Sequence, residues 1–337
     1  MKAIIILMTF CPFENSPRYG RVYVDYFLPG LSTLNILDSA LIKRVFVDDF
    51  PYFTRRETLH WPEYLREGMA FNGGMKWRRL RSLVSPIFSS AKLRDIYTEL
   101  PTPMQQAIEN IRTTAGISSS NDMGGEVEVR RLMKCLTLDI LCRICFSASI
   151  DSYNQPDSKM VYHMLNAFKM SKLKLILLKL PAKFQNWLDI SLINQTSSTW
   201  FGNFIKCLIQ ERKSHLEHKY NDFLQMLLNS EVSEELLAQQ ELELNVDQSS
   251  DKRPKSFSFS KHLSEKEIVG QILVFFFAGA ETLTALFSEP LHLLAQHPDK
   301  QEKLYEEIMD KFPEGVFALD DPFKCKYLNA VIDEVQR

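Results

Sequence analysis

The sequence predicts a mainly α-helical fold with a small β part. After Gly74, apolar residues recur at helical spacing almost to the end of the chain, whereas alternation typical of strands is confined to residues 19–37. The chain has 337 residues, of which 45% are hydrophobic, and this is enough for a sizeable core. No internal repeat is found, so we expect one large domain over residues 19–337.

The β part comes first. Residues 19–37 alternate apolar and polar positions on either side of Pro29 and Gly30, which predicts two short strands joined by a turn. Asp38 then provides an N-cap for a helix that continues to residue 50. Further helices are predicted at residues 75–83, 90–115, 126–147, 157–172, 198–230, 264–297 and 299–311.

Composition narrows the function classes. The net charge of −2 gives no whole-chain field that would attract nucleic acid, so we expect no nucleic-acid partner. The 23 phenylalanines indicate a large core, an apolar ligand pocket, or both.

The only close pair among the six cysteines, Cys142 and Cys145, lies in an apolar helical stretch. We expect these two to be buried thiols rather than a metal or redox site, in a reduced, cytosol-facing protein.

Three segments stand apart from this pattern. The apolar run at residues 3–13 has 11 residues, against about 20 for a membrane span, so residues 1–18 are interpreted as an N-terminal remnant. Residues 238–261 are polar and rich in serine and lysine, which predicts a mobile loop inside the domain. Residues 173–180 set two lysines among leucines and isoleucine. This composition fits either an amphipathic core helix or a segment that dips into a membrane surface.

The helix predicted at residues 264–297 is the most informative element. Ser264 and Glu267 form a capping-box pattern at its start, and residues 272–278 are apolar on every side, which indicates a helix through the core. Ala278-Gly279-Ala280-Glu281-Thr282 follows inside that helix. One interpretation is a helix interface, in which Glu281 finds a basic partner and Thr282 bonds back to the Ala278 carbonyl. The other is a site, where Gly279 admits a flat ligand and the acid and hydroxyl move protons.

Two shorter patterns accompany this helix. Trp77 and Arg81 are spaced i,i+4 on one helical face, where an indole N–H and a guanidinium can bind a carboxylate. A solvated basic helix explains the same residues. Glu334 and Arg337 are spaced i,i+3, a pattern common in charged helices and uninformative alone.

The order of these three patterns resembles the cytochromes P450, and within them the animal drug- and steroid-oxidising family 3, with thromboxane synthase as a near relative. The matching text lies at residues 76–95, 275–308 and 326–337, with weaker likeness at 45–58 and 221–230. The resemblance covers residue 19 to the end. It implies a cytochrome P450 fold.

The resemblance also implies a role for each matching residue. The residues expected to contact haem are Trp77, Arg81 and Arg55 at the propionates and Ala278 and Gly279 over the ring face. Glu281 and Thr282 would be the acid–alcohol pair that delivers protons during oxygen activation. The residues expected to shape the substrate pocket are Phe276, Phe277 and Ala280. Glu334 and Arg337 would form an ion pair that locks the haem-side core.

The activity implied is that of a haem-dependent monooxygenase that oxidises small apolar compounds with dioxygen and NADPH-derived electrons. The implied cofactor is haem b, iron protoporphyrin IX, and the implied partners are an NADPH–cytochrome reductase, a small apolar substrate and a membrane surface. The implied location is the cytosolic face of the endoplasmic reticulum membrane. A non-catalytic fragment or pseudo-enzyme is the alternative, and a helical lipid carrier is a third.

Some features depart from the family pattern. Its N-terminal membrane helix and proline-rich hinge are not recognised here, and Pro290 interrupts the long helix. The family's haem loop, Phe-x-x-Gly-x-x-x-Cys-x-Gly, is expected beyond Arg337. The sequence therefore predicts a truncated fold with an incomplete haem site and no metal ligand within residues 1–337.

The first prediction concerns the cysteines of residues 1–337. None has glycine both four residues before it and two residues after it, as the haem loop requires. We therefore expect purified residues 1–337, mixed with haem and a reductant, to give no thiolate-type band in a carbon-monoxide difference spectrum. Appearance of that band would show that one of these six cysteines ligates the iron.

Overall fold

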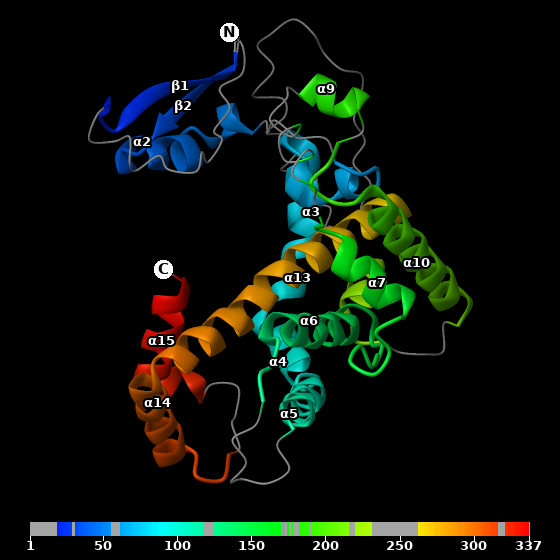
Figure 1. Ribbon diagram of the computed structural model, residues 1–337. Coiled ribbons are helices and arrows are strands. Elements are labelled where there is room, and N and C mark those ends of the chain that lie inside the picture. The colour runs from blue at the N-terminus through cyan, green and yellow to red at the C-terminus, as the bar shows by residue number, and fades with distance from the viewer. Residues whose placement is uncertain are drawn as a thin grey trace, which may run out of the picture.

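A computed structural model describes residues 19–28, 31–54, 61–116, 125–169, 171, 174, 177, 182–188, 190–215, 220–230, 262–315 and 321–336. The described chain is mainly helical with one β-hairpin, which confirms the predicted fold class (Figure 1). The predicted N-terminal remnant and the loop at 238–261 lie outside the described residues, as does all of 173–180 except Lys174 and Leu177.

The hairpin is formed by β1 (Val22–Leu28) and β2 (Leu31–Ile36), which pair antiparallel from Val22 opposite Ile36. Asp38 caps the next helix as predicted, because its Oδ1 accepts the N–H groups of Ala40 and Leu41 at 3.1 and 3.0 Å. The α-helix α2 (Ser39–Lys43) is shorter than predicted. It continues as a π-helical turn at Arg44–Asp48 and a 3-10 turn at Phe50–Phe53. β-branched Val45 and Val47 and the following proline disfavour a longer α-helix.

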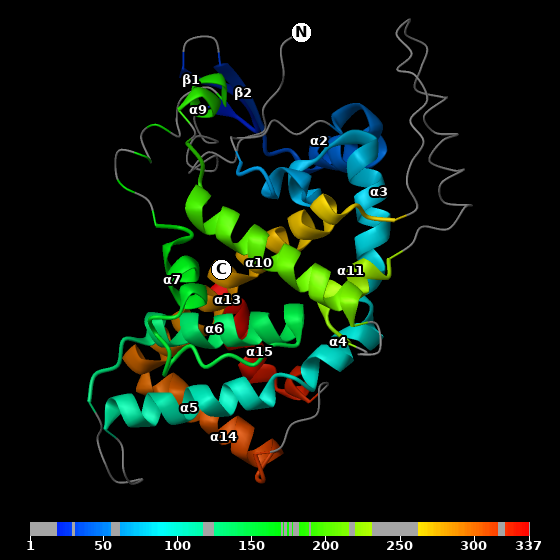
Figure 2. The ribbon, with the colours of Figure 1, turned by 90° about the vertical axis from the view of Figure 1, so that its right-hand side faces the viewer.

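Eleven further α-helices lie in the described parts of the chain. They are α3 (Gly74–Val84), α4 (Ser90–Tyr97), α5 (Pro101–Ala115), α6 (Val129–Phe146), α7 (Lys159–Asn166), α9 (Ala182–Trp187), α10 (Gln195–Ser214), α11 (Phe223–Leu228), α14 (Pro298–Lys311) and α15 (Lys326–Gln336), together with the long α13 (Glu265–Gln296). In Figure 2, α10 and α6 cross α13 on one side, and α5 and α14 lie farther along it.

Two predicted helices were wrong in length, because each is broken in two. The helix predicted at 90–115 ends at Tyr97, and α5 restarts at Pro101, which has no N–H to donate back along a continuous helix. The helix predicted at 198–230 ends at Ser214. Asp222 then caps a new helix, its Oδ1 accepting the Gln225 N–H at 2.9 Å.

The long helix α13 is continuous, as predicted. Ser264 and Glu267 form the capping box in both directions: the Ser264 hydroxyl accepts the Glu267 N–H at 3.3 Å, and the Glu267 carboxylate accepts the Ser264 N–H at 2.9 Å. Among the described residues α13 alone is long and apolar enough to cross a membrane, with a mean hydropathy of 1.6 in its most apolar window, but 56% of that window is buried inside the protein. It is the central helix of the core.

Aromatic rings fill the space around the middle of α13. Phe276 contacts Phe201 and Phe146 with ring centroids 5.1 and 5.9 Å apart, and Phe277 contacts Phe201 at 5.5 Å. Cys142 and Cys145 are fully buried in the same core, which confirms their prediction as buried thiols, and burial raises the pKa of both. Within the described ranges, no three metal-ligating side chains come together.

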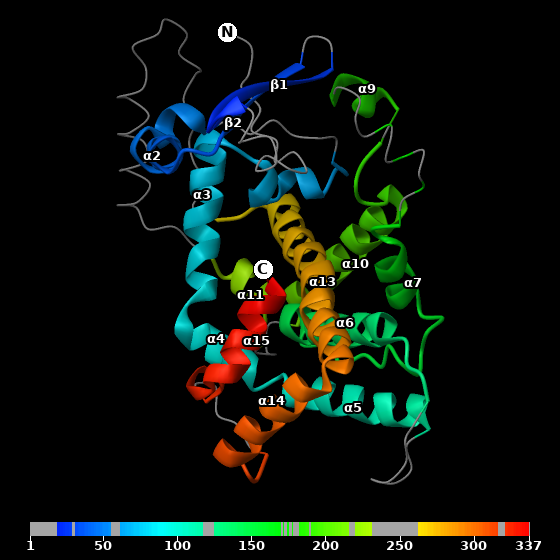
Figure 3. The same ribbon diagram turned by 60° about the vertical axis from the view of Figure 1, so that its left-hand side comes forward.

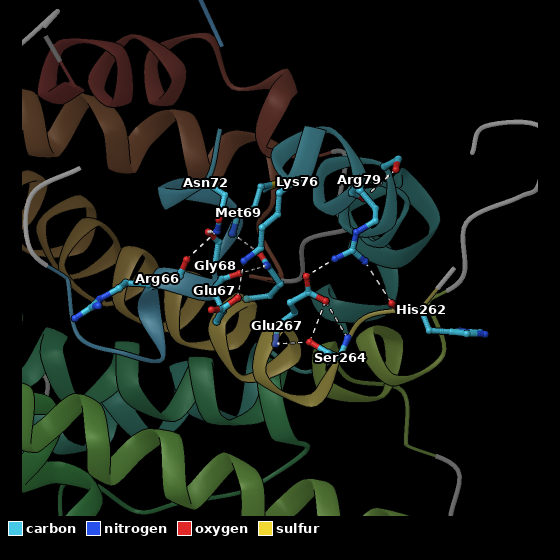
Figure 4. Close-up of polar contacts among 12 residues, drawn as sticks. Arg66, Glu67, Gly68, Met69, Asn72, Lys76, Arg79, His262, Ser264 and Glu267 are labelled. Carbon is cyan, nitrogen blue, oxygen red and sulfur yellow. Dashed lines mark hydrogen bonds and ion pairs between the residues drawn. The ribbon is translucent and has the colours of Figure 1, made fainter. Parts of the chain in front are cut away.

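A buried polar cluster fixes the N-terminal end of α13 to residues 65–79 (Figure 4). The Arg79 guanidinium forms an ion pair with the Glu267 carboxylate, and both side chains are 9% exposed. Arg79 also donates to the carbonyl of His262 at 3.3 Å. Gln271 accepts the Met69 N–H at 2.9 Å and donates to the Glu67 carbonyl at 3.3 Å. These bonds fix the chain before α3 on α13.

A second buried ion pair joins three other helix ends. Arg212, near the end of α10, binds both carboxylate oxygens of Asp222 at 2.6 and 2.5 Å and donates to the carbonyl of Phe146 at 3.1 Å. Ser147, which ends α6 with a positive φ of 53°, donates to the same carboxylate at 2.6 Å. Asp222 therefore holds α6, α10 and α11 together.

Asp139 is an unusual buried acid on α6. Its side chain is 1% exposed; one oxygen accepts the Ser152 N–H at 3.4 Å, and the other has no hydrogen-bond partner. Burial raises the pKa of this carboxyl from 3.8 to about 6, nearby Asp151 adds to the rise, and the bonds from Ser152 and the charge of Arg143 oppose it. Compared with the unfolded chain, the folded protein therefore favours the protonated form of this carboxyl.

The second prediction follows from that carboxyl. Between about pH 4 and pH 6 the folded state binds more protons than the unfolded state, so Asp139 lowers the free energy of unfolding as pH rises through this range. We expect Asp139→Asn to raise the free energy of unfolding by about 1–3 kcal/mol at pH 7.5 and by almost nothing below pH 4. Urea denaturation at both pH values measures this.

The matched control is Asp157→Asn, which removes the same charge from an exposed position. A stabilisation by Asp139→Asn that was equal at pH 4 and pH 7.5 would contradict the ionisation argument.

Candidate functional site

The segment Ala278–Thr282 occupies the middle of α13, where the helix changes from buried to partly exposed. Ala278 and Thr282, one turn apart, are exposed, whereas Phe276, Phe277 and Ala280 are buried. An apolar helix with a face of small residues is a plausible support for a flat apolar group. This face is the candidate site.

Glu281 points away from that face toward α6. Its carboxylate pairs with Arg130 at 2.7 Å and with Lys134 at 3.6 Å. The Thr282 hydroxyl donates to the Ala278 carbonyl at 2.7 Å, with a longer contact of 3.3 Å to the Gly279 carbonyl. Both contacts expected of a purely structural helix interface are therefore present. The acid and the hydroxyl do not bind each other, and their proton-delivery role stays a prediction.

Gly279 has a packing role. A Cβ added here would lie 3.0 Å from the Leu141 side chain of α6, so the missing side chain permits close approach of α6 and α13. Its predicted contact with haem stays a prediction, but close helix packing is a second reason for glycine at this position.

The basic helix α3 lies beside the N-terminal half of α13 (Figure 3). Trp77 is partly exposed and packs on Phe50, with ring centroids 5.3 Å apart. Arg81 is exposed and pairs with no carboxylate of the described residues, so its guanidinium is available to an anion. Arg55, the other predicted propionate contact, lies outside the described residues.

The helix α15 carries the predicted ion-pair motif. Glu334 is exposed on it, and Arg337 lies outside the described residues, so their pairing stays a prediction. Glu307 of α14 fixes the start of α15, because its carboxylate accepts the N–H groups of Tyr327 and Leu328, the shortest at 3.0 Å. This capping was not apparent from the sequence, where Glu307 is one of several acids in a charged helix.

A cavity of about 330 Å³ lies beside the N-terminal half of α13, and Ala278 is one of its lining residues. The described residues that line it are all apolar or aromatic; they are Trp61, Leu65, Ala70, Phe71, Phe168, Leu192, Ile193, Val274, Phe277 and Ala278. Trp77, Arg81 and Thr282 are not among the described residues that line this cavity, so a site that they share with Ala278 stays a prediction.

Of the three residues predicted to shape the substrate pocket, one lines this cavity. Phe277 lines the cavity, whereas Phe276 and Ala280 lie in the core and are not among the lining residues; their pocket role stays a prediction. Sequence reasoning missed the other walls, because they come from short segments far apart in the chain and carry no motif. Aromatic residues at 61, 71 and 168 were the only signal, and such residues usually mark core.

Comparison with known proteins decides the family. The family model described as Cytochrome P450 matches residues 8–337. The chain belongs to the cytochrome P450 family. Relatives include cytochrome P450 3A14 of Cavia porcellus, 27% identical over 334 residues (96% of this chain, 60% of that protein), and cytochrome P450 3A12 of Canis lupus familiaris, 26% identical over 327 residues (95% and 59%). Lithocholate 6-beta-hydroxylase of Mesocricetus auratus is 25% identical over 324 residues (94% and 59%).

The chain spans about 60% of the length of these relatives. Membership of the family implies haem and an oxidoreductase chemistry. The described residues fit part of a haem site: the small exposed face at Ala278 and Thr282 suits a flat ring, and the exposed Arg81 suits a carboxylate. Of the described cysteines, Cys207 is exposed on α10 and the other four are buried.

Proposed function

We propose that the protein is a haem-dependent monooxygenase that oxidises small apolar compounds with dioxygen and with electrons that an NADPH–cytochrome reductase passes on. The observation that carries this proposal is the position of the apolar cavity. Ala278 is one of its lining residues and lies one helical turn from the exposed Thr282. A compound held in the cavity would therefore present one end beside the proposed haem face.

When bound, haem supplies the oxygen activation and C–H oxidation that protein side chains cannot perform. Arg81 and Trp77 would hold a haem propionate through their N–H groups, and Ala278 would leave room for the ring. The cavity would orient the substrate and exclude water from it. Thr282 would hold a proton at Oγ1 on the haem side of α13.

The proposed proton path uses the Glu281 carboxylate and the Thr282 hydroxyl. Thr282 Oγ1 donates to Ala278, and its lone pairs remain able to accept a proton. Glu281 is half-exposed and pairs with Arg130 and Lys134, so solvent reaches its carboxylate. We propose that a rotation of Glu281 or a bridging water links the two.

A non-catalytic binding protein is the second candidate. The satisfied contacts of Glu281 and Thr282 favour it, because both side chains have a structural role without any chemistry. A longer chain that carries the family's haem loop, once loaded with haem, separates the two candidates. A thiolate-type carbon-monoxide band together with NADPH-dependent product supports the enzyme, and binding of apolar compounds without either supports the carrier.

The third prediction concerns Thr282. In a longer chain that carries the family's haem loop, loaded with haem and supplied with reductase, we expect Thr282→Ala to lower product formation by roughly 100-fold, because a positioned proton donor is lost. NADPH consumption should fall far less, with peroxide appearing instead. Thr282→Ser keeps the hydroxyl and is the matched control. Equal loss of product formation and NADPH consumption in Thr282→Ala would remove Thr282 from the proton path.

Membrane attachment is part of the proposal, on the cytosolic face of the endoplasmic reticulum. The exposed apolar residues of α9 include Trp187, which is 80% exposed, and Phe184, and the exposed Leu188 follows the helix directly. The hairpin β1–β2, with exposed Val22 and Val24, lies at the same end of the molecule in Figures 1, 2 and 3. Aromatic and aliphatic side chains gathered at one end suit insertion into a bilayer interface.

The fourth prediction tests that surface. We expect Trp187→Glu to weaken binding of the protein to phosphatidylcholine vesicles roughly tenfold or more, because the apolar transfer of the indole is lost. Co-sedimentation with vesicles measures it. Tyr305→Glu is the control, since Tyr305 is also exposed but lies on α14 at the opposite end (Figure 1). Equal weakening by both variants would exclude α9 as the docking surface.

A further inference from the structure

Tyr64 joins two of the segments that form the apolar cavity. It lies within residues 61–71, the segment that contributes Trp61, Leu65, Ala70 and Phe71 to the lining. Its hydroxyl donates to Asn203 Oδ1 at 3.0 Å and accepts a hydrogen bond from Lys206 Nζ at 3.0 Å. Both partners lie on α10, so these bonds tie one wall of the cavity to a helix far away in the chain.

The ring of Tyr64 also lies against α10. A Cβ on Gly202 would overlap the ring carbons, so the ring occupies the space that glycine leaves free on the helix. The Lys206 ammonium lies over the ring, 4.7 Å from its centroid. The hydrogen bond to Tyr64 raises the pKa of Lys206, and burial opposes this rise. The contacts of Tyr64 with Gly202, Asn203 and Lys206 are called the Tyr64 clasp.

A different contact anchors the far end of the same segment. Gln271 of α13 bonds the Met69 N–H and the Glu67 carbonyl. Near Tyr64, the Arg66 Nε donates to the Trp61 carbonyl at 2.7 Å, so Trp61 is tied to the part of the segment that the clasp holds. Loss of the clasp would therefore free the Trp61 end, while Gln271 still holds the Met69 end on α13.

The α10 side of the clasp leads to another wall of the cavity. Ile193 lines the cavity and lies two residues before the start of α10. The N–H of Asn194 donates to the Ala167 carbonyl at 2.8 Å, which holds the neighbouring Phe168, also a lining residue, close to the start of α10. The clasp therefore fixes the wall with Trp61 relative to the wall with Phe168 and Ile193.

We propose that Tyr64 is a positioning residue for the cavity: its clasp to α10 holds the aromatic pair Trp61 and Phe71 where a bound apolar compound contacts it. The rings of this pair have centroids 4.2 Å apart, so they form one joint surface. Tyr64 is not among the described lining residues, so it acts through its segment. This inference rests on the proposed function in taking the cavity as the substrate site.

The test uses purified residues 1–337 and naphthalene as the apolar probe, with free naphthalene measured by headspace gas chromatography. Tyr64→Phe keeps the ring against Gly202 and removes both hydrogen bonds. We expect it to weaken naphthalene binding roughly 2- to 12-fold, which corresponds to the net contribution of a hydrogen bond.

Two variants break the clasp from α10. Asn203→Leu and Lys206→Met change no described lining residue, and each should weaken naphthalene binding as Tyr64→Phe does. Gln210→Leu, at an exposed position of α10, is the matched control and should bind naphthalene as the wild-type chain does. Circular dichroism checks that each variant folds.

Two readouts separate positioning from a general loss of stability. Tyr64→Phe combined with Asn203→Leu should bind naphthalene about as well as the more affected single variant, because the same clasp is broken in both. In chain labelled with 5-fluorotryptophan, the fluorine resonance of Trp61, assigned by its loss in Trp61→Phe, should shift in every clasp variant. The resonance of Trp187 on α9, assigned in the same way, should not shift.

Three results would overturn the inference: no binding of naphthalene to the wild-type chain, wild-type affinity in the folded clasp variants, or additive effects in the double variant. Should Tyr64→Phe fail to fold, Asn203→Leu and Lys206→Met decide, since neither side chain is buried.

The proposed function fails separately from this inference. Clasp-dependent naphthalene binding, without NADPH-dependent product in a longer haem-loaded chain that carries the family's haem loop, would remove the monooxygenase function and leave the role of Tyr64 in place. Product formation by that longer chain, with naphthalene affinity that does not depend on the clasp, would remove the role of Tyr64 alone.

Discussion

The need to bury α13 constrains the whole arrangement. This 32-residue helix is apolar on every side near its middle, so helices must cover it on several sides at once, and α6, α10 and α11 do so. Burial also removes water from the helix N-terminus, where backbone N–H groups need partners. The capping box with Ser264 supplies them, and Arg79 neutralises the buried Glu267 carboxylate that completes it. Removing Arg79 alone would leave that charge unpaired, at a cost of about 3–5 kcal/mol.

Glycine sets how closely other segments approach α13. A Cβ on Gly270 would lie 2.8 Å from the backbone of residues 67 and 68, and one on Gly68 would lie 2.3 Å from a methyl group of Val274. Neither position has room for a side chain. This backbone contact brings the segment with Leu65, Ala70 and Phe71 onto α13 and so builds one wall of the cavity. The cavity thus depends on Gly68 and Gly270, which are not among its described lining residues.

Local signals explain which parts of the fold were predictable from sequence. The capping residues Asp38 and Ser264 and the alternation around the hairpin act within a few residues, and all three were found in place. The breaks before Pro101 and Asp222 were missed because apolar periodicity continues across them, although both residues are strong helix-start signals. The partners of Arg79 and Glu281 and the cavity wall depend on contacts more than 100 residues apart, which spacing in one sequence cannot reveal.

Glu281 has a packing role besides the proton-delivery role that we propose for it. Arg130 lies in the first turn of α6, where the helix dipole disfavours a cation, and Lys134 follows one turn later on the same face. The Glu281 carboxylate offsets both charges and joins the N-terminal end of α6 to α13. Because the pairs are partly exposed, their net contribution to stability is small, about 0–1 kcal/mol each. Glu281 can therefore leave α6 at little cost to the fold, which a residue that carries protons between solvent and the exposed face of α13 must be able to do.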